Sequence, residues 1–390
     1  MTGRFCRIAG FLAIGFVLTG STGLEPCASA ARGDDAQKKT GGEVKKNIGR
    51  KAASARRSLD EPFPKGRREK EFRKLLGEDF RVRHTDHFVV FYSADEEVVK
   101  DFIHRIEKTF DSVHRFSRRL NIKVDYTADK LPIIFCRNHD EFREIFRAIR
   151  GGEPPDEAAG LYLSGRANVS LFYDMSQNPF MREWADKARQ LRDEARTEID
   201  AGTRKAKVRE AQWYTNRSKV YREEQNRSVV QHEVAHQLLY NFRVHNFESS
   251  WANPQWLVEG LATLFEVPPG KHGAGAGVIN QRRLGDIRES IAEFTAEDWR
   301  RFIGAASPGR QMLSNEGYAR SWALAYFLVK RKSRELSRYV ELIKRRKTSR
   351  PVSAERELAD FEKCFGNVDD AFAASVAEFV KRLPYRAEQE

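Results

Sequence analysis

The chain has 390 residues, a formal net charge of +13 at pH 7 and 40% hydrophobic residues, which allows one large catalytic unit together with processing segments. Its four cysteines form no CxxC pair, and this excludes a thiol redox motif. The basic residues of the stretch 31–74, where much of the excess charge lies, are not interleaved with aromatic ones, so we expect no nucleic-acid partner.

The first 30 residues have the pattern of a cleavable secretory signal peptide. Arg4 and Arg7 precede an uninterrupted run of apolar and glycine residues at 8–18, and an A-x-A site ends at Ala30. A membrane anchor is the alternative, but a span needs about 20 apolar residues and this run is far shorter. We therefore expect an exported protein, secreted, periplasmic or in the cell envelope, with no integral membrane span after signal removal.

Residues 31–79 are predicted to be a basic, disordered linker. The stretch is rich in Lys, Arg, Gly, Ala and Ser and lacks apolar periodicity, so ordered structure is expected to begin near Phe80. Its charge would allow binding to an anionic envelope polymer or to lipid headgroups, and a solvated spacer is the simpler interpretation. With the leader removed only Cys136 and Cys364 remain, and the sequence leaves open whether they form a disulfide.

Residues 80–175 are predicted to form a small α/β subdomain. Runs of apolar β-branched and aromatic residues indicate strands, and apolar residues at helical spacing indicate the helices between them. In chain order we expect a strand at 87–92, a helix at 95–120, a strand at 131–136, a helix at 140–150 and two strands at 159–163 and 168–173. The last two strands are separated by a short connection around Gly165 and predict a β-hairpin.

Residues 176–227 are predicted to be a charged helical insertion. Their first half carries a narrow apolar stripe at helical spacing, made up of Trp184, Ala188, Leu191, Ala195 and Ile199. Between Pro179 and residue 227, Gly202 is the only helix breaker, so we expect a helical hairpin with its turn at residues 201–203. Such an arm could cover a cleft or contact a partner, although a charge-rich helix is more often simply solvated.

Residues 228–242 have the pattern of a buried helix that can bind a metal. The stretch lacks Gly and Pro, carries apolar residues at helical spacing and contains His232-Glu233-Val234-Ala235-His236. On an α-helix the two histidines lie one above the other on one face, with Glu233 beside them. Two imidazoles in this arrangement can bind one tetrahedral Zn²⁺, and the carboxylate can reach a water on the metal. The simpler alternative is a surface helix with two solvated imidazoles.

The next segment supplies a third ligand. Asn253 is a favourable N-cap and Pro254 suits the first helical position, so a second helix is predicted from there to about Glu266. Glu259 lies in it among apolar residues, where an unpaired carboxylate is unfavourable. A metal removes that penalty. The two histidines and Glu259 make a His₂Glu set that leaves one position open, as catalytic zinc requires.

With both helices present, the chain resembles the gluzincins, the zinc peptidases that include thermolysin and the aminopeptidases with a W-x-x-E-G-x-A helix. The matching residues are His232, Glu233, His236, Trp256, Glu259, Gly260 and Ala262. More closely, residues 87–383 resemble an uncharacterised family of gluzincin-type peptidases found in bacterial secreted proteins. The resemblance implies a zincin-like α+β fold. A small mixed sheet with helices would be followed by a mainly helical subdomain at 228–390, which carries both metal-binding helices.

The resemblance also implies roles outside these helices. In gluzincins the strand before the zinc helix is a sheet edge that pairs with the extended substrate; here that strand is 168–173, with an ordinary edge strand as the alternative. Gluzincins often use a Tyr on a downstream helix to donate a hydrogen bond to the oxyanion, and Tyr318 is the candidate, with a packing role as the alternative. Thermolysin orients a His with an Asp four residues after its Glu ligand. That position is Thr263, so support must come from elsewhere, for example from a backbone carbonyl.

The rest of the chain predicts a loop and a set of helices. Residues 268–277 are rich in glycine but lack the sequence context of a phosphate loop, so we expect a rim to the cleft, with His272 as a candidate substrate contact. Helices are expected at 284–294, 296–304, 316–330, 333–346, 354–365 and 368–383.

Together these features predict a secreted zinc metallopeptidase that acts on a peptide or protein substrate. Zn²⁺ would be bound by His232, His236 and Glu259, with Glu233 as the general base and Tyr318 as an oxyanion donor. Two alternatives stay open. One is a non-catalytic, zinc-stabilised module that binds the envelope, and the other is a zinc amidase that acts on cell-wall peptides.

Overall fold

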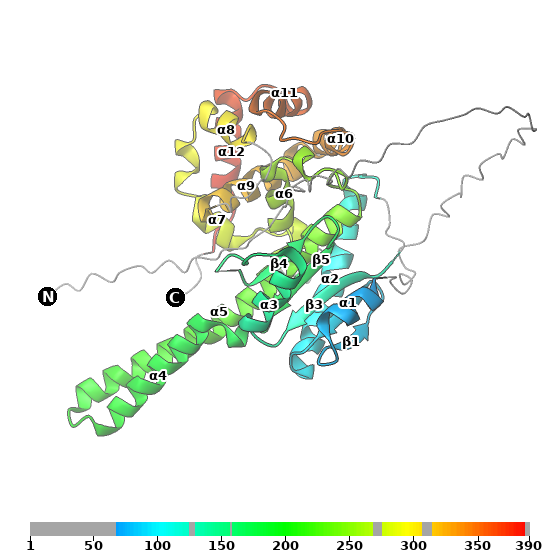
Figure 1. Ribbon diagram of the computed structural model, residues 1–390. Helices are drawn as coiled ribbons and strands as arrows, with labels where there is room; N and C mark the ends of the chain where they lie inside the picture. Colours follow the sequence, from blue (N-terminus) through cyan, green and yellow to red (C-terminus); the bar gives the residue numbers. More distant parts are fainter. Residues whose placement is uncertain (1–67, 125–128, 157, 268–274, 306–313, 387–390) are drawn as a thin grey trace, which may run out of the picture.

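The computed structural model describes residues 68–124, 129–156, 158–267, 275–305 and 314–386. Within these residues a five-stranded mixed sheet forms the centre of the N-terminal half (Figure 1). Its strands are β1 (Arg81–His84), β2 (Phe88–Tyr92), β3 (Leu131–Cys136), β4 (Gly160–Leu163) and β5 (Val169–Tyr173), in the spatial order β1-β2-β3-β5-β4. The three inner strands are parallel to one another, and β1 and β4 are antiparallel to their neighbours.

Helices account for most of the remaining described residues, so the predicted α+β class is confirmed. They are α1 (Glu69–Leu76), α2 (Glu96–Arg119), α3 (His139–Arg150), α4 (Pro179–Thr197), α5 (Ala201–Asn241), α6 (Gln255–Thr263), α7 (Gln281–Ile287), α8 (Ala296–Ile303), α9 (Asn315–Arg331), α10 (Ser333–Lys344), α11 (Ala354–Phe365) and α12 (Asp370–Lys381). The segment predicted as one helix at 284–294 is divided between α7 and a short 3₁₀ turn, Ser290–Glu293. The helices from α6 onward form the mainly helical C-terminal part (Figure 1).

Helices cover both faces of the sheet. On one face Phe102 of α2 packs against Phe135 of β3, with ring centroids 4.4 Å apart. On the other face Phe72 of α1 packs against Phe91 of β2 at 5.5 Å. Because both faces are covered, every residue of β2, β3 and β5 is buried, which explains why these strands are almost entirely apolar in the sequence, with Ser170 of β5 as the polar exception.

The predicted linker at 31–79 ends earlier than expected, because α1 lies inside it. Phe72 and Leu76 are four residues apart, so they share one face of this short helix, and both are buried. Three apolar residues among charged ones, of which Leu75 is exposed, give too weak a periodicity to stand out in the sequence. Strand β1, an alternation of basic residues with one valine, was also not predicted.

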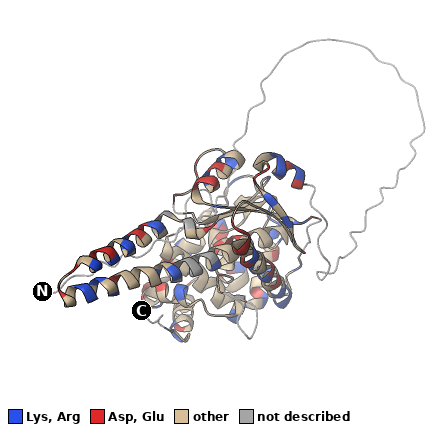
Figure 2. Ribbon diagram, turned by 90° about the horizontal axis from the view of Figure 1, so that it is seen from below, with Lys and Arg blue, Asp and Glu red and all other residues tan. Residues whose placement is uncertain are grey.

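The insertion is a helical hairpin, as predicted, but its second arm continues into the helix that carries His232 and His236. The turn lies at residues 198–200 rather than 201–203, because the Asp200 side chain accepts a hydrogen bond from the Thr203 N–H and caps α5 there. No Gly or Pro follows Gly202 before Asn241, so α5 runs unbroken for 41 residues. Ile199, predicted on the apolar stripe, is 95% exposed at the tip. The arm projects from the body and is rich in both charges (Figures 1 and 2).

The predicted hairpin at 159–173 is present, but its second strand is not a sheet edge. β5 pairs with β3 on one side and with β4 on the other, so the prediction of 168–173 as a substrate-binding edge is wrong. The edge on this side is β4, whose four residues are buried. Which strand of a hairpin joins the sheet depends on distant pairing, and the hairpin sequence does not encode it.

Other predictions concern single features of the chain. Cys136 and Cys364 are both free thiols. No helix in the described part of the chain has the length and apolar character needed to cross a bilayer. The predicted signal peptide, the linker up to residue 67 and the loop residues 268–274, including His272, lie outside the described residues.

Candidate metal centre

The second half of α5 is fixed to the sheet by buried side chains that face away from the histidines. Gln237 donates a hydrogen bond to the Pro132 carbonyl (2.9 Å) and accepts one from the Ser170 hydroxyl (3.0 Å). A Cβ on Gly160 of β4 would lie 2.6 Å from the Phe172 ring and 2.9 Å from Val229 of α5, so only glycine lets helix and strand approach this closely. The histidine pair therefore projects from a helix that cannot slide on the sheet.

Helix α6 is fixed to the C-terminal helices instead. The sequence predicted Asn253 as the N-cap of this helix, but α6 begins at Gln255 and Asn253 does not cap it. The Asn253 side-chain amide instead forms two hydrogen bonds with the backbone of Asn246, at 2.7 and 2.9 Å. Gly260 permits close packing on α9, since a Cβ there would lie 2.6 Å from the Ser321 carbonyl oxygen. Glu259, the preceding residue, is thereby directed by contacts with α9.

These helices bring the three predicted metal ligands together in the protein interior. His232, His236 and Glu259 are 0%, 0% and 2% exposed. Nε2 of His232 lies 2.9 Å from Nε2 of His236 and 3.2 Å from Oε2 of Glu259. The distance from Nε2 of His236 to Oε2 of Glu259 is 3.3 Å, so the three atoms form a nearly equilateral triangle. Ligand atoms 2.0–2.1 Å from a tetrahedral zinc ion lie about 3.3 Å apart. The triangle therefore fits zinc.

The chemistry of this group also fits a cation. Burial acts to raise the pKa of Glu259, but the two histidines outweigh it and hold the pKa at about 2, so the carboxylate is ionised. An ionised carboxylate oxygen and two imidazole nitrogens converge within 4.8 Å of one another. This buried group could hold a metal ion, and neutral imidazole nitrogens with a carboxylate oxygen are ligands that zinc accepts.

Glu233 lies next to this triangle and has one unused oxygen. Its Oε2 accepts a hydrogen bond from the backbone N–H of Tyr162 on β4 at 2.7 Å. Its Oε1 is buried without a hydrogen-bond partner among the described residues. Burial raises the pKa of Glu233 to about 8, which makes this carboxylate more basic than an ordinary one. The side chain is held at one oxygen and available at the other.

A second buried carboxylate supports His232 from behind. Oε1 of Glu266 lies 3.1 Å from Nδ1 of His232, the ring nitrogen opposite the metal side. Arg283 donates two hydrogen bonds to the same carboxylate, at 2.8 and 3.0 Å, and Asn280 donates a third at 2.8 Å. Burial acts to raise the pKa of Glu266, but Arg283 and His232 outweigh it and hold the pKa well below its usual range. The support of His232 is thus a carboxylate, not the backbone carbonyl that the sequence suggested.

Tyr318 also lies at this centre. Its ring makes an edge contact with the His232 ring at a centroid distance of 6.0 Å, and the Arg283 guanidinium lies 5.1 Å from its ring centre. Burial, followed by the nearby carboxylates of Glu259 and Glu233, raises its pKa well above the ordinary value. The hydroxyl therefore keeps its proton and remains a donor. Arg283 links the support of His232 to the position of Tyr318.

Sequence reasoning missed Glu266 and Arg283 for a physical reason. The predicted second helix extends to Glu266, but α6 ends at Thr263 and the chain bends before Glu266. Because Glu266 lies beyond the end of the helix, its sequence distance from Glu259 does not indicate where its side chain lies relative to the metal-ligand candidates. Arg283 offers no pattern either, since nothing local distinguishes this fully buried arginine from its half-buried neighbour Arg282. Thr263, the position that carries Asp in thermolysin, donates a hydrogen bond to the Gly260 carbonyl.

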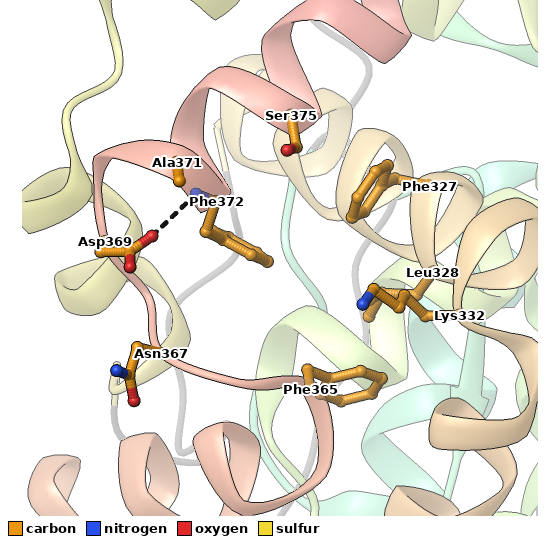
Figure 3. A pocket seen from close by; sticks show the side chains of 9 residues that line it. All are labelled: Phe327, Leu328, Lys332, Phe365, Asn367, Asp369, Ala371, Phe372 and Ser375. Atoms are coloured by element: carbon orange, nitrogen blue, oxygen red, sulfur yellow. Dashed lines mark hydrogen bonds between the residues drawn. The ribbon is translucent and has the colours of Figure 1, made fainter.

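A separate hollow of about 200 Å³ lies far along the chain from this centre (Figure 3). Its wall is mostly apolar, and its charged members are Lys332 and Asp369. Asp369 is engaged as the N-cap of α12, accepting the Phe372 N–H at 2.9 Å. None of the metal-ligand candidates lines it, so this hollow is not the site of the predicted chemistry.

Replacing Gly260 with alanine should weaken both the fold and metal binding. The new methyl group would overlap the Ser321 carbonyl and push α6 from α9, with a cost of about 1–3 kcal/mol in the free energy of unfolding. Because Glu259 adjoins Gly260, we also expect a lower metal affinity, measured by competition with a chelator. Gly202→Ala is the matched control. It lies in the exposed arm and should leave both quantities unchanged or stabilise the helix, and equal behaviour of the two variants would contradict the packing role.

Comparison with known proteins adds a family match without a function. A family model described as a protein of unknown function (DUF1570) matches residues 226–352, which is less than half of the chain. The matched segment contains the histidine pair, Glu233, Glu259 and Tyr318, together with Glu266 and Arg283. No curated protein matches the chain. The metal-ligand candidates and their supporting residues thus lie within one matched segment.

Proposed function

We propose that this protein is a zinc-dependent peptidase of the gluzincin type. The observation that carries the proposal is the buried triangle of two Nε2 atoms and one carboxylate oxygen, with sides of 2.9–3.3 Å, next to a glutamate that has an unused oxygen. A structural zinc site is closed by four protein ligands, whereas a catalytic one keeps a position open. Three ligands with an adjacent base favour catalysis over a purely structural site.

The chain's own residues then have distinct tasks. Zinc held by the triangle would supply Lewis-acid polarisation of a carbonyl and an acidified water. Glu233 accepts a proton at Oε1, while the Tyr162 N–H holds Oε2 and fixes the direction of the free oxygen. The protonated carboxyl then donates to the leaving amine. Tyr318, whose hydroxyl stays protonated, is the candidate donor to the developing negative charge.

The proposal places this chemistry outside the cytoplasm. Its support is the sequence pattern of residues 1–30 and the basic stretch that follows, which would contact an anionic envelope polymer. Sequencing the N-terminus of the protein recovered from its source would give Ala31 as the first residue.

Elemental analysis of purified protein tests the metal site. We expect about one zinc per chain in the wild type and loss or strong weakening of binding in Glu259→Ala and His236→Ala, because each removes one of three ligands. Gln212→Ala is the matched control on the same helix. Gln212 lies on the exposed arm, where its side chain donates a hydrogen bond to Asn216, and its loss removes no ligand, so the variant should keep its zinc. A folded wild type without zinc would contradict the proposal.

Peptidase activity is tested by a substrate search. The zinc-loaded protein is incubated with an unbiased peptide mixture and, separately, with cell-wall stem peptides, and new termini are identified by mass spectrometry. Cleavage of ordinary peptide bonds supports the peptidase. Cleavage confined to the cell-wall peptides would favour the amidase, and no cleavage by a fully zinc-loaded protein would favour the non-catalytic module.

A further inference from the structure

His245 is a buried histidine whose side chain has no hydrogen bonds. It is 0% exposed, and neither Nδ1 nor Nε2 has a partner among the described residues. Nearly all buried polar groups in folded proteins are paired, and an unpaired one is unfavourable because it has lost its bonds to water. Both ring nitrogens of His245 are therefore available to a polar partner.

The backbone on both sides of His245 is fixed. Arg243, with φ of 57°, turns the chain back at the end of α5, and the N–H groups of Val244 and His245 both donate to the Leu239 carbonyl, at 2.9 and 3.1 Å. The next residue, Asn246, donates to carbonyls at the end of α10, including that of Ile343. The chain therefore holds His245 in place without using its ring.

The ring is linked to the metal-ligand candidates through Tyr240, and it lies close enough to His236 and Glu259 to be influenced by their charges. It contacts the Tyr240 ring at a centroid distance of 4.9 Å, and Tyr240 is one helical turn after His236 on the same face of α5. Tyr240 in turn contacts Tyr162, whose backbone N–H holds Glu233. Burial first, and then repulsion from His236 when that ring is protonated, lowers the pKa of His245 to about 3. At neutral pH the ring is uncharged and carries one N–H donor and one acceptor.

Two simpler roles do not fit these observations. As a metal ligand, His245 would have to join the group whose ligand atoms lie within 4.8 Å of one another, and that group consists of His232, His236 and Glu259. As a packing residue, an apolar side chain of the same size would fill the space without two unpaired nitrogens. The unpaired donor is useful only when a polar ligand is present.

We propose that His245 is a ligand-binding residue of the metal centre, which donates its ring N–H to the carbonyl oxygen of a substrate bound there. The inference rests on the proposed function and adds a second neutral donor beside Tyr318. Donors of this kind, placed in a water-excluded site, typically change a reaction rate by about 10²–10³-fold when removed. The His245 side chain would share the developing charge with the metal.

The test uses His245→Leu, which removes the donor at similar volume, and His245→Gln, which restores an N–H. The cobalt-loaded proteins are titrated with acetohydroxamate, a small carbonyl compound that binds metals, and the visible spectrum of the cobalt gives the dissociation constant. We expect His245→Leu to bind the compound at least about tenfold more weakly and His245→Gln to recover part of the loss, with one metal per chain in both. In urea, the metal-free Leu variant should unfold at the same or a higher midpoint than the wild type.

The control is His87→Leu, another buried histidine, whose Nδ1 is paired with Glu107 at 2.6 Å. It should lower the urea midpoint and leave acetohydroxamate binding unchanged. Equal binding by wild type and His245→Leu would overturn the inference and leave the peptidase proposal standing. Loss of metal from His245→Leu, or a large loss of its stability, would also overturn it. Weakened binding in a protein that cleaves no peptide would keep the His245 site and refute the peptidase, whereas a wild type without metal would refute both.

Discussion

Glu233→Gln is expected to lower peptide hydrolysis by about 10²–10⁴-fold while the protein keeps one zinc per chain. The amide has the same shape as the carboxylate, and its oxygen can still accept the Tyr162 N–H. It cannot take up a proton at the position of the unused Oε1. The loss should therefore appear in kcat, with zinc content and the urea unfolding midpoint close to those of the wild type.

Glu248→Gln is the matched control for this variant. Glu248 is an exposed glutamate seven residues after Asn241, the last residue of α5, and it contacts no member of the metal centre in the described part of the chain. It should hydrolyse the same peptide at the wild-type rate. If Glu233→Gln retained zinc and worked as fast as Glu248→Gln, the general-base role would be wrong, and zinc lost from Glu233→Gln would make Glu233 a structural residue instead.

The ligands were predictable because they depend on local geometry. The spacing of His232 and His236 places both rings on one face of any α-helix, and this holds wherever the helix lies in the fold. The apolar surroundings of Glu259 in the sequence likewise predicted its burial, and it is 2% exposed. Patterns that repeat with the helix period carry such information without knowledge of the partner.

The residues that support the ligands were not predictable, because they lie where helices end. His245 contacts Tyr240 because Arg243 reverses the chain after α5, and Glu266 reaches His232 because the chain bends after Thr263. The order of β4 and β5 was missed for a similar reason, since the pairing of β5 with β3 joins segments far apart in the sequence. In each case the decisive contact joins residues that are distant in the sequence, and a pattern of apolar residues with the helix or strand period does not reveal such a contact.

The centre is built from two bodies that meet at the ligands. Gln237 ties the histidine helix to the sheet. Gly260 packs the Glu259 helix on α9, and Asn246, which pairs with Asn253 before that helix, donates to the Ile343 carbonyl of α10. A metal bound by all three ligands would join these two bodies, so its binding should add to the stability of the whole protein. Glu266 lies at the same junction, because it contacts His232 of one body and Arg283 of the other.

Glu266→Leu is expected to have the second large effect, on metal affinity and stability together. Without the carboxylate, His232 loses the group that orients its ring, and loss of such support typically weakens metal binding by about 10–100-fold. Arg283, which is 0% exposed, loses its ion-pair partner, and an uncompensated buried charge costs about 3–5 kcal/mol. Zinc affinity is measured by chelator competition, and the unfolding free energy by urea denaturation of the metal-free protein.

The double variant Glu266→Leu/Arg283→Met separates the two effects. Replacing both members of a buried ion pair with apolar side chains of similar size is often neutral or stabilising, so the stability of the metal-free protein should largely return. Metal affinity should not return, because His232 still lacks its carboxylate. If the second substitution restored affinity along with stability, Glu266 would act only through the fold, and the contact of its Oε1 with Nδ1 of His232 at 3.1 Å would have no part in orienting the ligand.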